Sequence, residues 1–380
     1  MSRSGSKPGG TKPSRPIRSL VVAGARPNFM KVAPLLRRMH EREDFDPILV
    51  HTGQHYDAVM SDGFFRDLGI PEPDFNLGVG SGSHAEQTGQ VLIKIEQLIF
   101  AEAPDLILVV GDVNSTLAAT LAAVKLDVPV AHVEAGLRSG DRKMPEEINR
   151  IMTDSVSTWL FVTEEAGRIN LLKEGVPSSK IHFVGNVMID TLLDHLERAR
   201  SLDNVLEALQ VTPGSYAVLT LHRPSNVDDP ERLKALFGAL EELHQEVPIV
   251  FPVHPRTQAA IETQLGGASP KLQLSPPLGY LEFLRLMADA RLVLTDSGGI
   301  QEETTVLGVP CLTLRDNTER PVTLEEGTNT MAGSNPEVIK KCFRDVIAHG
   351  GKQGKAPPLW DGHAADRILD ILASQPRSAS

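Results

Sequence analysis

The chain is predicted to be an α/β protein made of two doubly wound domains that face each other across a cleft. Short apolar runs alternate with amphipathic helix patterns from Ser19 onward, and the same alternation restarts near Tyr216. Strands that alternate with helices in this way form parallel sheets with helices on both faces. A length of 380 residues is enough for two hydrophobic cores.

The composition is that of an ordinary globular protein, with 41% hydrophobic and 23% charged residues. No apolar run is long enough to span a membrane, and the N-terminus lacks the apolar core of a signal peptide. Cys311 and Cys342 are the only cysteines, and neither has a Cys or His at metal-ligand spacing. We therefore expect a cytoplasmic protein with no membrane partner, no disulfide framework and no metal site.

The net charge of −11 is unevenly distributed. Residues 1–18 contain five Lys or Arg and no acidic residue, so the rest of the chain is more acidic than the net charge indicates. An acidic body is a poor surface for nucleic acid, and no nucleic-acid partner is expected. Residues 1–17 are rich in Ser, Gly, Pro and Lys and lack apolar residues, which predicts a disordered basic tail.

The elements of the first half follow from apolar runs bounded by turn residues and from apolar positions at helical spacing. The expected strands are 20–23, 47–50, 106–110, 128–134, 159–162 and 181–184. The expected helices are 29–41, 86–101, 116–125, one from 146 and one through 172. A charged helical pattern at 190–209 is expected to cross over to the second half.

The second half repeats this pattern and ends in a further helix. The expected strands are 216–220, 247–253, 291–294 and 309–314, with helices at 231–245, within 258–274 and 281–294, before Gly308, and at 364–373. We therefore divide the chain into a first domain, residues 18–188, and a second, nucleotide-binding domain, residues 189–359. A final helix within residues 360–376 is expected to pack back on the first domain.

The stretch Thr295–Glu303 lies between a strand and a helix, at the sheet edge where doubly wound folds bind ligands. The turn Ser297-Gly298-Gly299 would let backbone N–H groups and the positive helix end face one anion. Glu303, about one helical turn further on, is suited to accept hydrogen bonds from sugar hydroxyls. A tight turn with a capping Ser explains the same residues, but a phosphate-bearing ligand is the favoured interpretation.

Polar residues also follow the expected strands of the first half. Arg26 and Lys31 flank a helix start, and Asp112 follows an expected strand. Glu146 lies at another helix start, so capping and surface charge remain alternatives for these positions.

His132 and Glu134 are two positions apart in an expected strand, so they should share one of its faces. Both faces of a parallel sheet are normally apolar, so a carboxylate there needs a partner or a function.

In the second half, His222 and His254 each end an expected strand. A lone strand-end histidine is usually structural, whereas two in the half that carries the Ser-Gly-Gly turn favour ligand contact. Arg315 and Arg320 follow the next strand, where an arginine could bind a diphosphate bidentately. No nicotinamide or P-loop motif and no Ser or Cys nucleophile motif is present, so no cofactor is expected.

As a set, the motifs resemble those of the non-hydrolysing UDP-N-acetylglucosamine 2-epimerases. They are GARPNFMKVAP, TGQH, GDVNSTLA, HVEAGLRS, MPEEINR, LHRPSN, PVH, TDSGGIQEE and TERP, in this order within residues 18–375. The resemblance implies the glycosyltransferase-B architecture, two Rossmann-like domains around a deep cleft. It also implies reversible conversion of UDP-N-acetylglucosamine to UDP-N-acetylmannosamine, through elimination of UDP to 2-acetamidoglucal and re-addition.

The resemblance assigns roles to individual positions. Those that match positions implicated in catalysis are Lys31, Asp112, Glu134, Glu146 and His222. Those that match nucleotide-sugar contacts are Arg26, His254, Phe283, Ser297, Gly298, Gly299, Glu303 and Arg320. Asp112 and Glu134 are expected to transfer the C2 proton, with Glu146 assisting. Family members are usually homodimers and are commonly activated by their substrate, for which Gln54 and Arg223 are the candidate residues.

Three different functions are also compatible with parts of the sequence. Asn28, Leu278 and the pair Pro224-Ser225 depart from the usual pattern and leave the sugar specificity open, so the chain could act on a UDP-2,3-diacetamido uronic acid sugar. A glycosyltransferase could share the same architecture, but it would not need acids around C2. A non-catalytic nucleotide-sugar sensor would lack catalytic positions that this chain retains.

Overall fold

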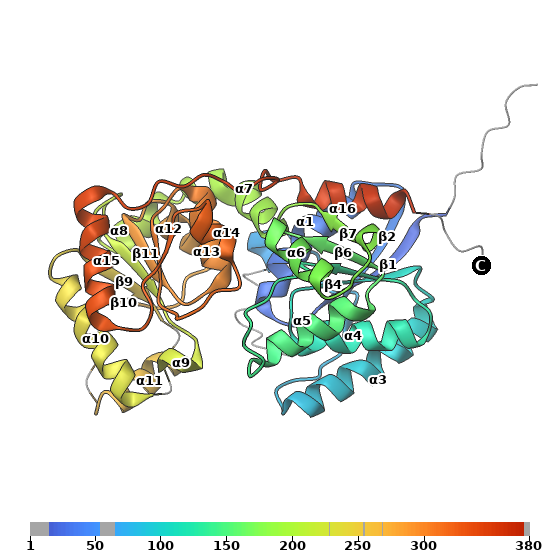
Figure 1. Cartoon of the computed structure of the whole chain (residues 1–380), viewed down its shortest axis with the longest axis horizontal. Coiled ribbons are helices and arrows are strands. Elements are labelled where there is room, and N and C mark those ends of the chain that lie inside the picture. The colour runs from blue at the N-terminus through green and yellow to red at the C-terminus, as the bar shows by residue number, and fades with distance from the viewer. Residues whose placement is uncertain (1–14, 54–64, 228, 254, 268, 376–380) are drawn as a thin grey trace, which may run out of the picture.

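The computed structural model describes residues 15–53, 65–227, 229–253, 255–267 and 269–375, and within these ranges the side chains of Arg26, Pro224, Ser225, Pro255 and Arg256 are not described. Two parallel sheets lie side by side, each covered by helices (Figure 1). Helix α7 (Val187–Arg200) lies between them at the top of this view. The predicted α/β fold class is confirmed.

The first sheet has seven strands in the order β3-β2-β1-β4-β5-β6-β7. All of its pairings are parallel. The strands are β1 (Ile17–Ala23), β2 (Phe45–His51), β3 (Phe75–Asn76), β4 (Leu106–Val110), β5 (Val130–Val133), β6 (Trp159–Val162) and β7 (Ile181–Phe183). The helices are α1 (Arg26–His40), α3 (His84–Glu102), α4 (Asn114–Lys125), α5 (Pro145–Val156) and α6 (Glu165–Lys173).

Side chains of β1 alternate between two hydrophobic clusters. Val21 lies in the cluster that contains Leu36 of α1, on one face of the sheet. Leu20 and Val22 lie in the cluster that contains Ile95 of α3. Burial on both faces is what a parallel sheet requires, and it explains why β1 is apolar at consecutive positions.

The second sheet has six strands in the order β10-β9-β8-β11-β12-β13, also paired in parallel throughout. The strands are β8 (Ala217–Thr220), β9 (Ile249–Pro252), β10 (Gln273–Ser275), β11 (Leu292–Thr295), β12 (Cys311–Thr313) and β13 (Asn329–Met331). The helices are α9 (Pro224–Val227), α10 (Pro230–His244), α11 (Pro255–Gln264), α12 (Tyr280–Ala288), α13 (Gly298–Leu307), α14 (Pro321–Glu325) and α15 (Pro336–His349).

Three helices connect the two halves. Helix α7, followed by α8 (Asp203–Ala208), packs against α1 on one side and against α12 and α13 on the other. After α15 the chain returns across the top of the molecule to α16 (Ala364–Ala373), which packs against α1 and α7 (Figure 1). The first amides of α16, those of Ala364 and Ala365, donate to the carboxylate of Asp190 at 3.1 and 2.7 Å.

The structure differs from the sequence predictions in the end of one strand, in several additional elements and in the length of the tail. The strand predicted at 128–134 ends at Val133, because Glu134 has a left-handed backbone with φ of +73°. Helices α9, α14 and α15 and strands β3 and β13 lie where no element was predicted. The basic tail ends before residue 17: Ile17 begins β1, and Arg15 pairs with Asp105 at 2.6 Å. Residues 1–14 lie outside the described residues.

Candidate active site between the domains

The carboxyl ends of the two sheets face a shared cavity of about 450 Å³. The first half contributes Lys31 from α1. The second half contributes Phe283 of α12 together with residues of α13 and the loop before α14. Of the positions singled out from the sequence, Lys31, Phe283, Ser297, Gly299, Glu303 and Arg320 line this cavity.

The predicted Ser-Gly-Gly turn forms the start of α13. Ser297 is the residue before the helix, and its backbone N–H donates to the hydroxyl of Thr295 at 2.9 Å. A Cβ on Gly298 would lie 2.9 Å from a carboxylate oxygen of Glu319, so only glycine fits without moving that acid. The first N–H groups of a helix have no intrahelical acceptor, so this end of α13 can bind an anion in the cavity.

A buried cluster of charges joins the two halves beside this helix end. Lys31 and Arg320 both form ion pairs with Glu134, which is 4% exposed. On its other side Arg320 contacts Glu302 of α13, with 2.5 Å between Nε and Oε1. Burial acts to raise the pKa of Glu134, but the two cations outweigh it and hold the pKa below its ordinary value.

The pKa values of Glu302 and Glu303 shift in the opposite direction from that of Glu134, because these two acids have fewer cations around them. Burial raises the pKa of Glu302 to about 7, although Arg320 opposes the shift. Burial also raises the pKa of Glu303 to about 8, and this carboxylate accepts a hydrogen bond from the Tyr280 hydroxyl at 3.4 Å. Both acids can therefore hold a proton near neutral pH.

Asp112 follows β4, and Glu134 follows the adjacent strand β5, as predicted from the strand ends. Arg150 of α5 donates to the Asp112 carboxylate at 2.8 Å, and Asn149 donates to its backbone carbonyl at 2.8 Å. Burial raises the pKa of Asp112, and the positive charges of Arg150 and Lys31 oppose the shift. Lys31, Asp112 and Glu134 thus form one group in the first half.

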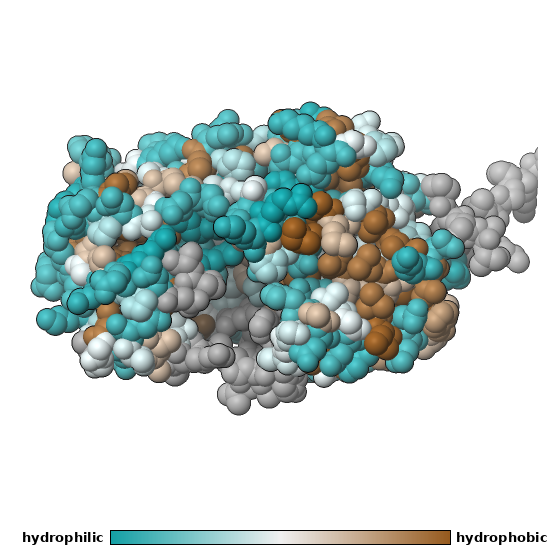
Figure 2. All heavy atoms as spheres, turned by 60° about the horizontal axis from the view of Figure 1, so that its bottom comes forward, coloured by the Kyte–Doolittle hydropathy of each residue, from teal (hydrophilic) through white to brown (hydrophobic). Residues whose placement is uncertain are grey.

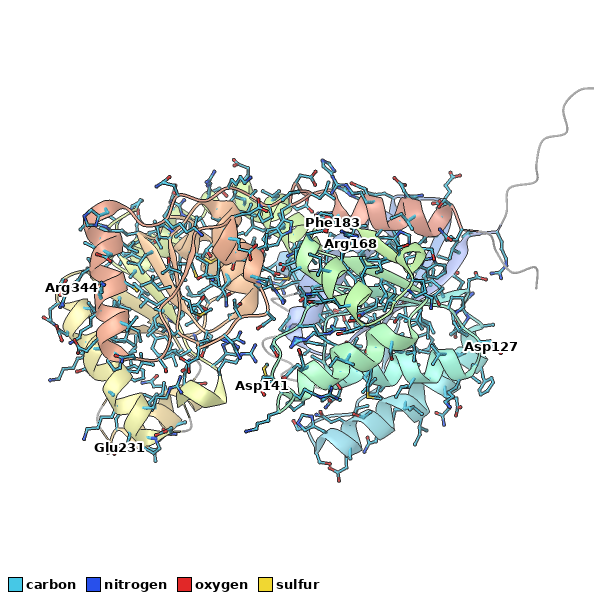
Figure 3. The ribbon with its side chains drawn as sticks, viewed as in Figure 1. Asp127, Asp141, Arg168, Phe183, Glu231 and Arg344 are labelled. Carbon is cyan, nitrogen blue, oxygen red and sulfur yellow. The ribbon has the colours of Figure 1, made fainter. Side chains whose placement is uncertain are left out.

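The other two predicted catalytic positions lie apart from this group. Glu146, in the first turn of α5, lines a second cavity of about 570 Å³ together with Arg223 and Arg315. Asp141, labelled in Figure 3, also lines it, from the loop of the first half that faces the second. The side chain of His222 is 57% exposed, and its Nδ1 lies 2.6 Å from Asp296.

The expectation that His132 and Glu134 share a strand face is wrong. The left-handed turn at Glu134 carries its carboxylate to Lys31 and Arg320, whereas the His132 ring is fully buried behind the site. His132 Nδ1 lies 2.7 Å from Asp154, and its Nε2 lies 2.9 Å from the Gly111 carbonyl.

Three predicted positions cannot be placed. Gln54 and His254 lie outside the described residues, as does the side chain of Arg26.

The structure also adds residues that the sequence reasoning missed. Glu302, Asp154 and Asp296 all contact predicted site residues or their supports. Glu302 and Asp296 stand within the TDSGGIQEE motif, so the motif itself was the available signal. Asp154 lies in the last turn of α5 and had no sequence signal.

Neither a membrane span nor a metal centre is found in the described part of the chain. No helix there is long and apolar enough to cross a membrane. No group of three or more His, Cys, Asp or Glu residues there is arranged to hold a metal ion.

Comparison with known proteins identifies relatives along almost the whole chain. A family profile for UDP-N-acetylglucosamine 2-epimerase matches residues 37–373. The UDP-N-acetylglucosamine 2-epimerase of Methanocaldococcus jannaschii is 44% identical over 360 residues, which cover 93% of this chain and 98% of that protein. The UDP-2,3-diacetamido-2,3-dideoxy-D-glucuronate 2-epimerase of Pseudomonas aeruginosa is 42% identical over 362 residues, which cover 94% of this chain and 99% of that protein.

A solved structure shows the same two-domain arrangement. The crystal structure of the Methanocaldococcus jannaschii UDP-GlcNAc 2-epimerase in complex with UDP-GlcNAc and UDP matches with a TM-score of 0.86 at 42% identity. The match covers 94% of this chain and 99% of that one. With a family profile over most of its length and relatives matched almost end to end, this chain belongs to the UDP-N-acetylglucosamine 2-epimerase family.

Proposed function

We propose that this protein interconverts UDP-N-acetylglucosamine and UDP-N-acetylmannosamine by inverting C2 of the sugar. UDP is eliminated to give 2-acetamidoglucal, and it is added back after reprotonation on the other face of C2. The observation that carries the proposal is the pairing of Glu134 with Lys31 and Arg320 beside the start of α13. Two cations for a departing diphosphate thus line the cavity, and both contact a carboxylate for proton transfer.

Each group has a role in this chemistry. The C2 hydrogen has no neighbouring carbonyl to acidify it, so Asp112 and Glu134 act as the proton-transferring carboxylates. Glu146 and His222, which lie apart from this group, are assigned a part in catalysis by their match to the family motifs. Arg320, the Ser297 hydroxyl and the amides of Gly298 and Gly299 hold the diphosphate, where positive charge stabilises the leaving group. Phe283 and Glu303 contact the nucleoside, and Arg26 and His254 contact the nucleotide sugar. No cofactor takes part.

The test is to incubate the protein with UDP-N-acetylglucosamine in heavy water and to follow C2 by NMR. The expected result is the manno isomer with deuterium at C2. Glu134→Gln should lose most of the rate, by about 100-fold or more. Glu165→Gln, which changes an exposed acid on α6, is the control and should keep the wild-type rate. Neither isomer nor exchange with the wild-type protein would exclude this function for this substrate.

The identity to the Pseudomonas aeruginosa protein favours a second candidate substrate. That relative is named for a UDP-2,3-diacetamido glucuronate, and it matches this chain almost as closely as the Methanocaldococcus jannaschii protein does. The same NMR assay with that sugar nucleotide distinguishes the two, because the preferred substrate has the higher kcat/KM.

We further propose that the second cavity binds another nucleotide sugar that activates the enzyme. Arg223, Arg232 and Arg315 line it together, which suits a diphosphate. Gln54 is the other candidate contact. Arg223→Gln is expected to abolish any sigmoidal dependence of rate on substrate concentration, while a hyperbolic curve for the wild type would exclude this activation.

The exposed surface of the first half supports a homodimer. Ile93 and Phe100 of α3 are 55% and 70% exposed, and Met152 and Val156 of α5 are 41% and 38% exposed. Figure 2 shows brown, hydrophobic surface spread over this half of the molecule. Apolar surface of this kind favours association.

Analytical ultracentrifugation tests this proposal directly. Phe100→Glu should give monomers, whereas Val338→Glu, which changes an exposed residue of α15, should not. A wild-type monomer at micromolar concentration would contradict it.

Both cysteines are free, which supports a cytoplasmic location.

A further inference from the structure

The charge cluster at the cavity contains more carboxylates than cations. Lys31 and Arg320 are the cations that contact it, and Glu134, Glu302 and Glu303 are its acids. Glu164, which precedes α6, lies close enough for its charge to act on Arg320 and Glu302. A diphosphate would add at least two negative charges to this group. Such an excess in a buried site is relieved by protonation of one of the acids.

Glu134 is the acid least able to take up that proton. It is in contact with both Lys31 and Arg320, so its ionised form is stabilised from two sides. Among the described residues, Glu302 forms an ion pair with one cation only, Arg320, and it is 1% exposed.

The position of Glu302 also differs from those of the remaining acids. Glu302 lines the cavity and contacts the arginine assigned to the diphosphate. Glu303 lines the cavity too, but it bonds to Tyr280 of α12, on the side where Phe283 lies. Glu164 is not among the residues that line it. Of these remaining acids, Glu302 alone both lines the cavity and contacts the arginine assigned to the diphosphate.

We propose that Glu302 is a further catalytic residue, a general acid that protonates the departing diphosphate. This inference rests on the proposed epimerase function. In the elimination step, the C1–O bond breaks and its electron pair stays on the β-phosphate oxygen. The proton of Glu302 moves to the diphosphate, the C2 proton moves to the carboxylate base, and the C2–H electron pair forms the C1–C2 double bond. On re-addition Glu302 takes its proton back.

The raised pKa of Glu302, about 7, agrees with this role because a general acid works best when its pKa lies near the operating pH. The groups that face it are the cations Arg320 and Lys31, the acids Glu134, Glu303 and Glu164, and the amide of Asn186.

Proton uptake on UDP binding gives a test that does not depend on turnover. Calorimetry with UDP at pH 8, in two buffers of different ionisation enthalpy, measures the number of protons taken up. The wild type is expected to take up more protons than Glu302→Gln, by up to about one. Glu164→Gln, which changes another buried acid that does not line the cavity, is the matched control. It should take up as many protons on UDP binding as the wild type does.

Turnover completes the test. Glu302→Gln is expected to bind UDP within about threefold of the wild type and to lose about 100-fold or more in kcat. Unchanged kcat, or unchanged proton uptake, in a folded Glu302→Gln variant would overturn the proposal. If this variant does not fold, Glu302→Asp should keep the proton uptake with a reduced kcat, and loss of the uptake would overturn it. Wild-type proton uptake without epimerisation would instead count against the proposed function.

Discussion

Arg320 donates a hydrogen bond to Glu134, a residue 186 positions earlier in the chain and at the end of a strand in the other sheet. The same guanidinium contacts Glu302 on α13. The cation assigned to the diphosphate is thus also the partner of the carboxylate assigned to proton transfer. Because both interactions use one side chain, binding of the diphosphate and exposure of the base are expected to be coupled.

Replacing Arg320 by Gln should therefore affect both stability and binding. Loss of one partner from a buried ion pair costs about 3–5 kcal/mol, because the remaining charge is left in a poorly solvated place. We expect the free energy of unfolding in urea to fall by that amount and the Kd for UDP to rise about 10-fold or more.

Arg344→Gln is the control for this change. Arg344 is a surface arginine on the outer side of the second half (Figure 3), and it pairs with Glu242 of α10 and with Glu246, which follows that helix. It should leave both the free energy of unfolding and UDP binding nearly unchanged, because a solvent-exposed ion pair adds little to stability. Equal losses of stability and of UDP affinity in Arg320→Gln and Arg344→Gln would contradict the assignment of Arg320 to the diphosphate.

His132 is expected to position the proton-transferring loops without touching the substrate. Its ring bonds to Asp154 and to the carbonyl of Gly111, next to Asp112, while Asp154 also accepts the N–H of Gly136 at 3.1 Å. His132→Gln can keep only part of this arrangement. It should lower kcat by about 10-fold or more while the Kd for UDP, which depends on the other half, stays within twofold.

The conservative variant Asp154→Glu should recover part of the kcat lost in Asp154→Ala, since it retains an acceptor for the ring. A purely structural role would lower stability without this separation of kcat from UDP binding. Equal loss of kcat and of UDP affinity in His132→Gln would therefore reject the positioning role.

The sequence predicted those parts of the site that depend on strand ends. Asp112 and Glu134 were paired correctly because the carboxyl ends of adjacent parallel strands meet at one edge. The direction of the Glu134 side chain was not predictable, because the alternation of side chains along a strand stops where the backbone becomes left-handed. Glu302 was missed because neighbouring helical residues point about 100° apart, and composition does not say which of two glutamates faces the cavity.

The elements beyond Arg320 were missed for a different reason. Strand β13 reads Asn-Thr-Met and has no apolar run, since it is only three residues long at the edge of its sheet. Its place follows from pairing with β12, which is a tertiary contact.

The buried acid Glu303 predicts a pH dependence of stability. Its pKa is raised by burial to about 8 in the folded protein, above the ordinary value of 4.5. Between these two pH values the folded state binds a proton that the unfolded state does not, so this group lowers stability as pH rises. Glu303→Gln cannot ionise and lacks this contribution.

The difference in free energy of unfolding between Glu303→Gln and the wild type should therefore grow in favour of the variant, by up to roughly 1.4 kcal/mol per pH unit between about pH 5 and pH 8. Urea unfolding at four pH values measures it. Glu282→Gln, which removes an exposed acid on α12, is the control, and its difference should change with pH less than that of Glu303→Gln. A flat difference for Glu303→Gln would show that the acid is ionised throughout.

The last helix, α16, provides a test of the proposed domain division. Ile368 and Leu369 are fully buried in the core cluster that also contains residues of α1, and the helix starts on the carboxylate of Asp190. If α16 belongs to the first domain, Ile368→Ala should destabilise that domain by about 2–5 kcal/mol, because it leaves a cavity against α1 and α7. Ile371→Ala, on the same helix at a partly exposed position, should cost less.

Hydrogen exchange then shows which sheet is affected. Amides of β1 and β4 in the first sheet should exchange faster in Ile368→Ala, whereas those of β8 and β11 in the second should keep their protection. The Kd for UDP should stay within about twofold, because its contacts are assigned mainly to the second domain. Faster exchange in β8 and β11 with intact β1 and β4 would instead assign α16 to the second domain and move the boundary at residue 359.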